Sequence, residues 1–287
     1  MAGNVCYPRF HNVSNATDYP RNGGDGQTRR ALINHLLASS RASQFNIVAV
    51  TRDTQSARAQ KLSALPNVKV LSGDLANPDA IFEAAGPVWG VYSVQVNSDS
   101  EESQGKALID AAVLHGVKHF VYSSGDRGGS QRSETNPTND GEESPGDDVH
   151  DLAARDVLRN LSGDIHGKGF ARMWEQLGEK KLQFVATQAI GWFAAQSFLH
   201  PEEHRNKAGT LVGDALTQSE ADIIFKRVMG KSMPMSPCPI ASAVKMVLKD
   251  TMGDMFKWFR AEGYGGDLVA CREVHPKIAG FRNLVRR

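Results

Sequence analysis

The sequence contains little cysteine, and the cysteines it has are scattered. Its 287 residues include three, Cys6, Cys238 and Cys271, and no Cys-x-x-Cys pair. An odd number of cysteines at irregular spacing predicts neither a disulfide framework nor a zinc site. Thiols remain reduced in the cytosol, so we expect a cytoplasmic protein.

Excess charge and long apolar runs are also missing. The 33 basic and 32 acidic residues give a formal net charge of +1, which offers no electrostatic basis for binding nucleic acid or a membrane surface. No apolar run approaches the roughly 20 residues that cross a bilayer. Met1–Phe10 lacks the apolar core of a secretory signal. We therefore expect a protein that binds neither nucleic acid nor membranes.

Several catalytic motifs are absent as well. Reductases of the short-chain type use a tyrosine whose pKa is lowered by a lysine four residues later. The residues four positions after the five tyrosines are His11, Gly23, Val96, Asp126 and Leu268. The sequence also lacks the Gly-x-Ser-x-Gly motif of hydrolases and the His-Glu-x-x-His motif of zinc enzymes. A Tyr-x-x-x-Lys acid is therefore excluded, no catalytic residue is assigned, and no metal site is expected.

The stretch from Phe45 to Val94 alternates short apolar runs with helical segments. Strands are expected at Asn46–Val50, Val68–Leu71 and Gly90–Val94, and later at Lys118–Ser124. Helices are expected at Ser56–Leu65 and Asp79–Ala85, and later at Gln104–His115. This alternation indicates a parallel sheet covered on both faces, with a nucleotide at the carboxyl ends of its strands. We expect an α/β fold, a Rossmann-like doubly wound parallel sheet.

A glycine-rich turn precedes the helix expected at Thr28–Arg41. It contains Gly23, Gly24 and Gly26. Backbone N–H groups and the helix dipole make such a turn suitable for a pyrophosphate. The dinucleotide fingerprint, however, places spaced glycines directly after a strand, and Met1–Arg21 contains no recognisable strand. The turn is therefore either a pyrophosphate site or an ordinary connection.

Two further turns are candidate cofactor contacts. Thr51-Arg52-Asp53 ends the second strand of the fold, where an acidic residue suits the ribose of NAD and an arginine suits the 2′-phosphate of NADP. Arg52 comes first after the apolar run, which favours NADP. Gly73-Asp74-Leu75 ends the next strand, and Asp74 either contacts adenine or caps the turn.

The second half of the chain is less regular. Gly125–Asp148 is rich in glycine, serine and acidic residues, so we expect a mobile loop at 125–148. Thr217 and Glu220 form a capping-box pattern before a helix expected at Gln218–Met229. Ile240–Gly263 is rich in methionine and aromatic residues, which favours a core helix over the wall of an apolar substrate pocket.

Together these features predict two domains. We expect a Rossmann-like NADP-binding domain at 1–150, which includes the mobile loop. A smaller α+β lobe at 151–287 is expected to bind a substrate or a partner.

Six stretches together carry a resemblance to a known family. They are Val50–Asp53, Gly73–Leu75, Gln104–Lys106, Val117–Ser124, Val185–Gly191 and Gly213–Ala221. In this order they resemble the NmrA-like family, whose members are atypical short-chain dehydrogenases/reductases. The resemblance covers roughly Gly23–Ser124 and Asn160–His275, and it depends on the order and spacing of the stretches.

The resemblance implies NADP(H) in the crevice of a Rossmann domain. Arg52 would hold the 2′-phosphate, with Thr51 beside it. Asp74 and Leu75 would flank the adenine, and Gln95 and Asn97 would lie along the cofactor.

It also implies two functions. Some members are oxidoreductases of small molecules, including ones in fungal secondary metabolism. Others are redox sensors that bind NADP(H) and a regulatory protein partner without known turnover.

The chain departs from the family pattern in two places. Members carry Gly-Ala-Thr-Gly after the first strand, and we place the corresponding stretch near Asp18–Arg21. Members also carry a His-Phe-x-x-Lys helix and a Thr-x-Leu-Arg-Pro strand, which have no counterpart between Gly125 and Asn160. We therefore expect the first strand and one later strand to be degenerate or missing, through true loss or a gene-model error. A third hypothesis is a decayed chain with neither function.

Overall fold

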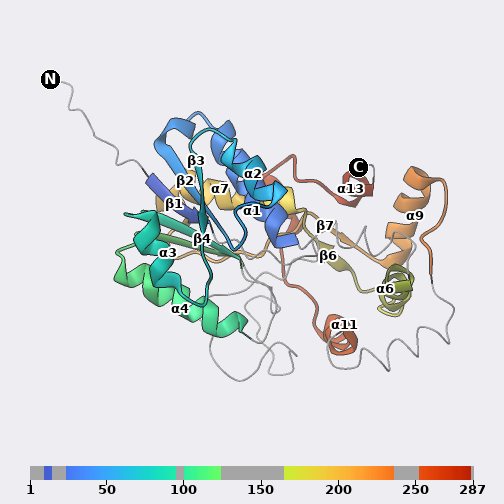
Figure 1. Cartoon of the computed structure of the whole chain (residues 1–287). Helices are drawn as coiled ribbons and strands as arrows, with labels where there is room; N and C mark the ends of the chain where they lie inside the picture. The colour runs from blue at the N-terminus through green and yellow to red at the C-terminus, as the bar shows by residue number, and fades with distance from the viewer. Residues whose placement is uncertain (1–9, 15–23, 95–99, 124–164, 236–251, 286–287) are drawn as a thin grey trace. The chain divides into compact units, whose positions relative to one another are not determined.

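The computed structural model describes residues 10–14, 24–94, 100–123, 165–235 and 252–285 (Figure 1). The chain divides into two compact units. The first comprises residues 1–123 and 190–207, and the second comprises residues 124–189 and 208–287. The predicted domain boundary at residue 150 lies outside the described residues and stays a prediction.

A parallel sheet organises the first unit. Its strands are β1 (Phe10–Ser14), β2 (Phe45–Thr51), β3 (Val68–Ser72), β4 (Gly90–Val94) and β5 (His119–Ser123). They are arranged in the order β3-β2-β1-β4-β5, and every neighbouring pair is parallel. The predicted Rossmann-like sheet is therefore confirmed.

The expectation of a degenerate or missing first strand was wrong. Phe10–Ser14 forms β1 at the centre of the sheet, where Val13 pairs with Val48 of β2 and with Val91 of β4. The segment Phe-His-Asn-Val-Ser has weak strand propensity, but backbone hydrogen bonding to two neighbouring strands overrides local preference. The predicted loss of a later strand concerns residues 125–160, and 124–164 lie outside the described part of the chain.

Both faces of the sheet are covered by helices. Phe45, Ile47 and Ala49 of β2 pack with α1 (Gly24–Ala38) and with residues of α7 (Thr187–Leu199) from Ala194 onward. The alternate residues, Val48 and Val50, pack with α3 (Pro78–Ala85) and α4 (Glu101–Leu114). The period of two along β2 thus separates two hydrophobic clusters, as expected of a doubly wound sheet.

The remaining elements of the first unit are short. They are η1 (Ala42–Gln44), α2 (Ala57–Ser63) and α8 (Pro201–His204). Helix α1 begins at Gly24, four residues before the predicted Thr28, and ends at Ala38 before the predicted Arg41. The N–H and hydroxyl of Ser39 both bond to the carbonyl of Leu36, which turns the chain out of the helix.

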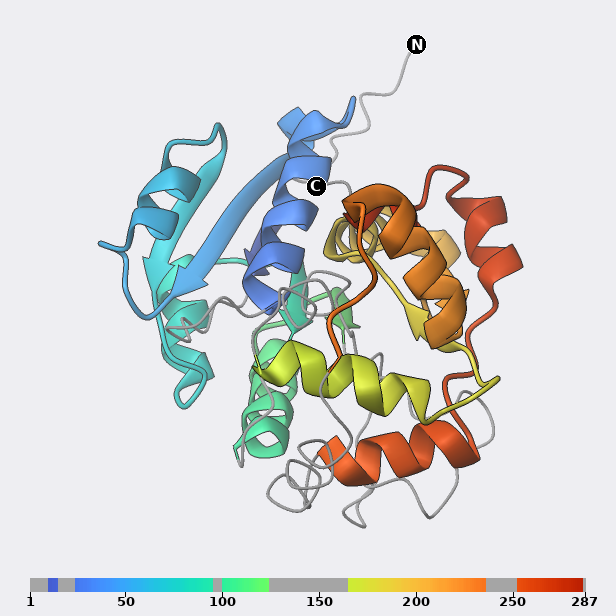
Figure 2. The ribbon, with the colours of Figure 1, turned by 90° about the vertical axis from the view of Figure 1, so that its right-hand side faces the viewer.

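The second unit surrounds an aromatic core. Its elements are α6 (Ile165–Glu175), β6 (Leu182–Phe184), β7 (Asp214–Leu216), α9 (Gln218–Met229), α11 (Met252–Ala261), α12 (Leu268–Val274) and α13 (Phe281–Val285). Strands β6 and β7 pair antiparallel, and Figure 2 shows the ribbon from a second side. Trp174 and Phe184 lie in the core with Phe256, Trp258 and Phe259 of α11. The prediction that the aromatic residues near the C-terminus are core is confirmed for these three.

No helix among the described residues is long and apolar enough to cross a membrane.

The contact between α1 and α7 provides a test of the packing. A Cβ on Gly191 would lie 2.4 Å from Ala31 Cβ and 2.6 Å from Leu32 N. Because the neighbours include backbone, we expect Gly191→Ala to lower the free energy of unfolding by about 1–3 kcal/mol, despite the helix propensity of alanine. Chemical denaturation measures this change.

Gly209→Ala is the matched control, since an added Cβ there meets nothing within 4 Å. We expect it to leave the free energy of unfolding near that of the natural chain. A Gly191→Ala protein as stable as this control would contradict the close contact.

Candidate functional site

The carboxyl edge of the parallel sheet is the candidate site. From β1 the chain proceeds to β2 and β3 on one side, and β4 and β5 lie on the other. The order therefore reverses between β1 and β4, which is where open α/β sheets bind ligands. Strands β1, β2 and β5 end in the hydroxyl residues Ser14, Thr51 and Ser123.

The turn after β2 distinguishes its two charged side chains. Thr51 is buried, and its hydroxyl donates to the carbonyl of Asp53 (3.3 Å) and accepts from the N–H of Asp53 (3.2 Å). Asp53 Oδ1 accepts from the N–H of Gln55 (2.8 Å). The carboxylate thus supports the turn, and both Arg52 and Asp53 are exposed at this strand end. A guanidinium here can pair with an anionic ligand.

The turn after β3 has a structural reason for each of its residues. The N–H of Gly73 bonds to the carbonyl of Thr51 (3.0 Å), and a Cβ on Gly73 would lie 2.7 Å from Ile81 Cγ1. The side chain of Leu75 is 2% exposed and belongs to the cluster under α3 and α4. Asp74 Oδ1 accepts from the N–H of Ala76 (3.0 Å). Of the two interpretations of Asp74, the structure shows that its side chain caps the turn. A contact with adenine would be additional to this role.

The structure brings some of the predicted cofactor residues together. Thr51 pairs with Ser72 in the sheet, so the turns bearing Arg52 and Asp74 follow neighbouring strand ends. Gly24 and Gly26 lie in the first turn of α1. Three further predicted residues, Gly23, Gln95 and Asn97, lie outside the described residues.

The end of β1 is the part of the site that the sequence reasoning missed. Because β1 ends at Ser14, the residues that follow it directly are Asn15-Ala16-Thr17-Asp18. This stretch begins earlier than the Asp18–Arg21 segment that we aligned with Gly-Ala-Thr-Gly. The retained Ala-Thr pair was the signal that could have located it.

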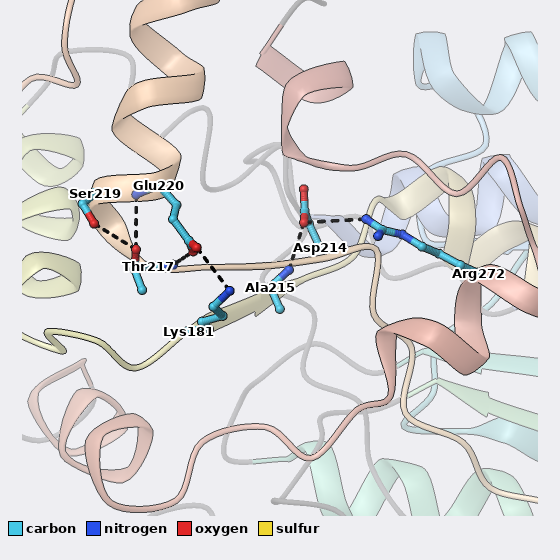
Figure 3. Close-up of polar contacts among 7 residues, drawn as sticks. All are labelled: Lys181, Asp214, Ala215, Thr217, Ser219, Glu220 and Arg272. Carbon is cyan, nitrogen blue, oxygen red and sulfur yellow. Dashed lines mark hydrogen bonds and ion pairs between the residues drawn. The ribbon is translucent and has the colours of Figure 1, made fainter.

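A second polar cluster lies in the second unit (Figure 3). The N–H of Thr217 donates to Glu220 Oε2 (2.8 Å), and the N–H of Glu220 donates to Thr217 Oγ1 (3.2 Å). The predicted capping box is therefore confirmed. Lys181 Nζ lies 3.2 Å from Glu220 Oε1. The hydrogen bond from the Thr217 backbone, followed by Lys181, lowers the pKa of Glu220.

Asp214 connects three elements of the same unit. Its Oδ1 accepts from the N–H of Ala215 (3.1 Å) and lies 3.8 Å from Arg272 Nη2 of α12. Its Oδ2 accepts from the N–H of Phe281 at the start of α13 (2.9 Å). The carboxylates of Asp214 and Glu220 in Figure 3 thus stabilise the local structure of the second unit. Across the ranges that the structure describes, no three His, Cys, Asp or Glu side chains gather as a metal site.

The capping box predicts a dependence of stability on pH. Because the pKa of Glu220 is lowered in the folded state, its contribution to stability is complete above the ordinary glutamate pKa of about 4.3. The contribution is lost as the pH falls through the folded-state pKa. We expect Glu220→Gln, which still accepts the Thr217 N–H, to destabilise the protein above pH 4.3 and to have a weaker effect in acid. Thermal unfolding from pH 6 to pH 3 measures the difference.

Glu273→Gln is the control, since this exposed glutamate lies in α12. An equal effect of Glu220→Gln at every pH would show that the charge of Glu220 contributes nothing.

Comparison with known proteins gives a consistent result. Residues 22–138 match the NmrA-like family. The NmrA-like family domain-containing oxidoreductase lnaB of Aspergillus flavus is 34% identical over 113 residues, which are 36% of this chain and 32% of that protein. The chain thus spans about a third of the length of the curated relatives it matches.

Solved structures agree on the fold. The triphenylmethane reductase of Citrobacter sp., complexed with NADP(H), superposes with a TM-score of 0.69 at 18% identity, covering 96% of this chain and 99% of that one. The negative transcriptional regulator NmrA, in complex with NADP, gives 0.67 at 14% identity, covering 98% and 95%. At these identities the likeness establishes the Rossmann-like fold alone.

Proposed function

Since residues 22–138 match the NmrA-like family, we propose that the chain is an NADP(H)-dependent oxidoreductase of a small molecule. One observation supports this most directly: Arg52 lies exposed at the carboxyl end of β2, on the edge where the strand order reverses. The relative lnaB is named an oxidoreductase, and the triphenylmethane reductase was crystallised with NADP(H).

The residues at the sheet edge fit NADP better than NAD. The 2′-phosphate is a dianion that pairs with a guanidinium, whereas the ribose of NAD requires an acceptor. Arg52 comes first after β2 and is exposed, and the Asp53 carboxylate that follows it accepts from the N–H of Gln55 within the turn. Asp74 follows the neighbouring strand and lies on the expected adenine side. The N-terminus of α1, at Gly24, would face the pyrophosphate.

The two units have different roles in the proposed reaction. When bound, NADP(H) supplies or accepts the hydride. The first unit would hold it through Thr51, Arg52 and Asp74, and the second unit would bind the substrate. Because the Tyr-x-x-x-Lys pair is absent, the proton donor is a different group from that of the short-chain reductases.

Cofactor preference tests the role of Arg52. We expect Arg52→Ala to weaken NADP binding by about ten- to a hundred-fold, the equivalent of one charge-assisted pair, and to change NAD binding little. Fluorescence titration with NADPH and NADH gives both dissociation constants.

Arg205→Ala is the matched control. Arg205 is exposed, belongs to the same unit and lies near His119, at the opposite end of β5 from the cofactor edge. It should leave both dissociation constants unchanged. Equal affinity of the natural chain for NADP and NAD would contradict the proposed role of Arg52.

The sequence after β1 predicts weak cofactor binding. Asn15 and Asp18 stand where the family has glycines, and a carboxylate repels the pyrophosphate. We expect Asp18→Gly to tighten NADPH binding, as measured by the same titration. The control is Asp110→Gly, which removes an exposed carboxylate from α4. Sub-micromolar binding by the natural chain would show that this part of the loop does not weaken the site.

Turnover separates the oxidoreductase from the sensor. NADPH oxidation with a triphenylmethane dye as test acceptor, extended to quinones, would support the enzyme. Tight NADPH binding without turnover of any acceptor would favour the redox sensor with a protein partner. If the chain does not bind NADPH at all, the hypothesis of a decayed chain with neither function is the one supported.

A further inference from the structure

Three aromatic rings meet at the amino end of β5. His119, the first residue of β5, stacks on Trp89 with ring centroids 5.4 Å apart and an interplanar angle of 20°. Phe198 of α7 meets His119 edge to face at 5.3 Å and Trp89 at 6.4 Å. The carbonyl of Trp89 accepts from the N–H of His119 (3.2 Å), which fixes the first pair of rings. Phe198 is 1% exposed, so the cluster closes against the end of α7.

The imidazole of His119 is poorly placed to carry a charge. Its Nε2 is buried and has no hydrogen-bond partner. A protonated imidazole has two N–H donors, so one of them would be buried without an acceptor. Burial accordingly lowers the pKa of His119, and a hydrogen bond with the Ser197 backbone opposes this.

The charged groups around the three rings lie in α8 and directly after it. His204 and Arg205 disfavour a charge on His119, while Glu202 favours it. Glu202 also lies 3.3 Å from Arg205 Nη2. Helix α7 contains no charged residue. Lys118, directly before β5, is also basic and exposed.

We propose that Trp89, His119 and Phe198 form an acid-sensitive latch that holds the end of α7 and α8 against the sheet of the first unit. The neutral imidazole packs between two apolar rings. Protonation makes that packing unfavourable and releases residues 193–205 locally. A second attachment does not involve His119, because Arg41 donates to the carbonyl of Leu199 and to Gln44 Oε1. Release is therefore local, and the latch is independent of the proposed oxidoreductase activity.

One physical effect opposes release. The faces of tryptophan and phenylalanine attract cations, so a protonated His119 gains some cation–π energy. This attraction does not supply the acceptor that the buried Nε2–H lacks.

Hydrogen exchange followed by mass spectrometry on the full chain tests the latch. Between pH 7.5 and pH 5, after correction for intrinsic exchange, we expect the protection of residues 193–205 to fall by up to about tenfold per pH unit below the ordinary histidine pKa. His119→Phe keeps a ring between Trp89 and Phe198 and removes the titrating group. It should abolish most of this dependence.

Two controls separate the latch from general acid effects. His115→Gln changes the histidine that stacks on Phe82 under the other face of the sheet, and it should leave the dependence intact. His204→Gln removes the other histidine whose pKa burial lowers, and it should reduce the dependence only in part. Equal acid loosening in the natural chain and in His119→Phe would overturn the proposal.

A direct measurement covers the case in which His119→Phe does not fold. The NMR titration of the His119 ring in the natural chain should give a pKa below about 6.5. A pKa at or above that value would show that cation–π attraction dominates, and it would overturn the latch.

Discussion

The pairing of β1 with two neighbours is the constraint on which the first unit depends. β1 is hydrogen-bonded to β2 on one side and β4 on the other, and without it the sheet would separate into two strand pairs. Its position creates the reversal of strand order and defines the candidate cofactor edge. It also identifies Asn15 as the residue that directly follows the strand. The proposed cofactor site therefore follows from a strand of five residues with little intrinsic strand propensity.

The turns at this edge serve the fold and the proposed chemistry together. Gly73 allows the close approach of Val50 and Ile81, and Leu75 anchors α3 and α4. A family motif such as Gly-Asp-Leu can therefore be explained by packing before any ligand is considered. Arg52 is different, because its guanidinium is exposed at a strand end on the edge where the strand order reverses. This contrast is why cofactor choice is assigned to Arg52.

Histidine illustrates how burial changes the meaning of a residue type. Nothing in the sequence distinguishes His119 from His115, since both lie at the end of a regular element and neither has metal spacing. Folding stacks one on Trp89 under α7 and the other on Phe82 beside α4. Only the first has a buried nitrogen without a partner, which gives that position its proposed sensitivity to acid.

The sequence by itself determined the features that depend on local pattern. The buried apolar run of β2, the capping box at Thr217 and Glu220, and the aromatic core residues of α11 were all predicted correctly. Only the tertiary structure decided the existence of β1 and the return of residues 190–207 to the first unit. Hydrophobic periodicity and capping are properties of neighbouring residues, so they can be read along the chain. Strand pairing and long-range packing depend on partners far away in the sequence, and their energies override local preference.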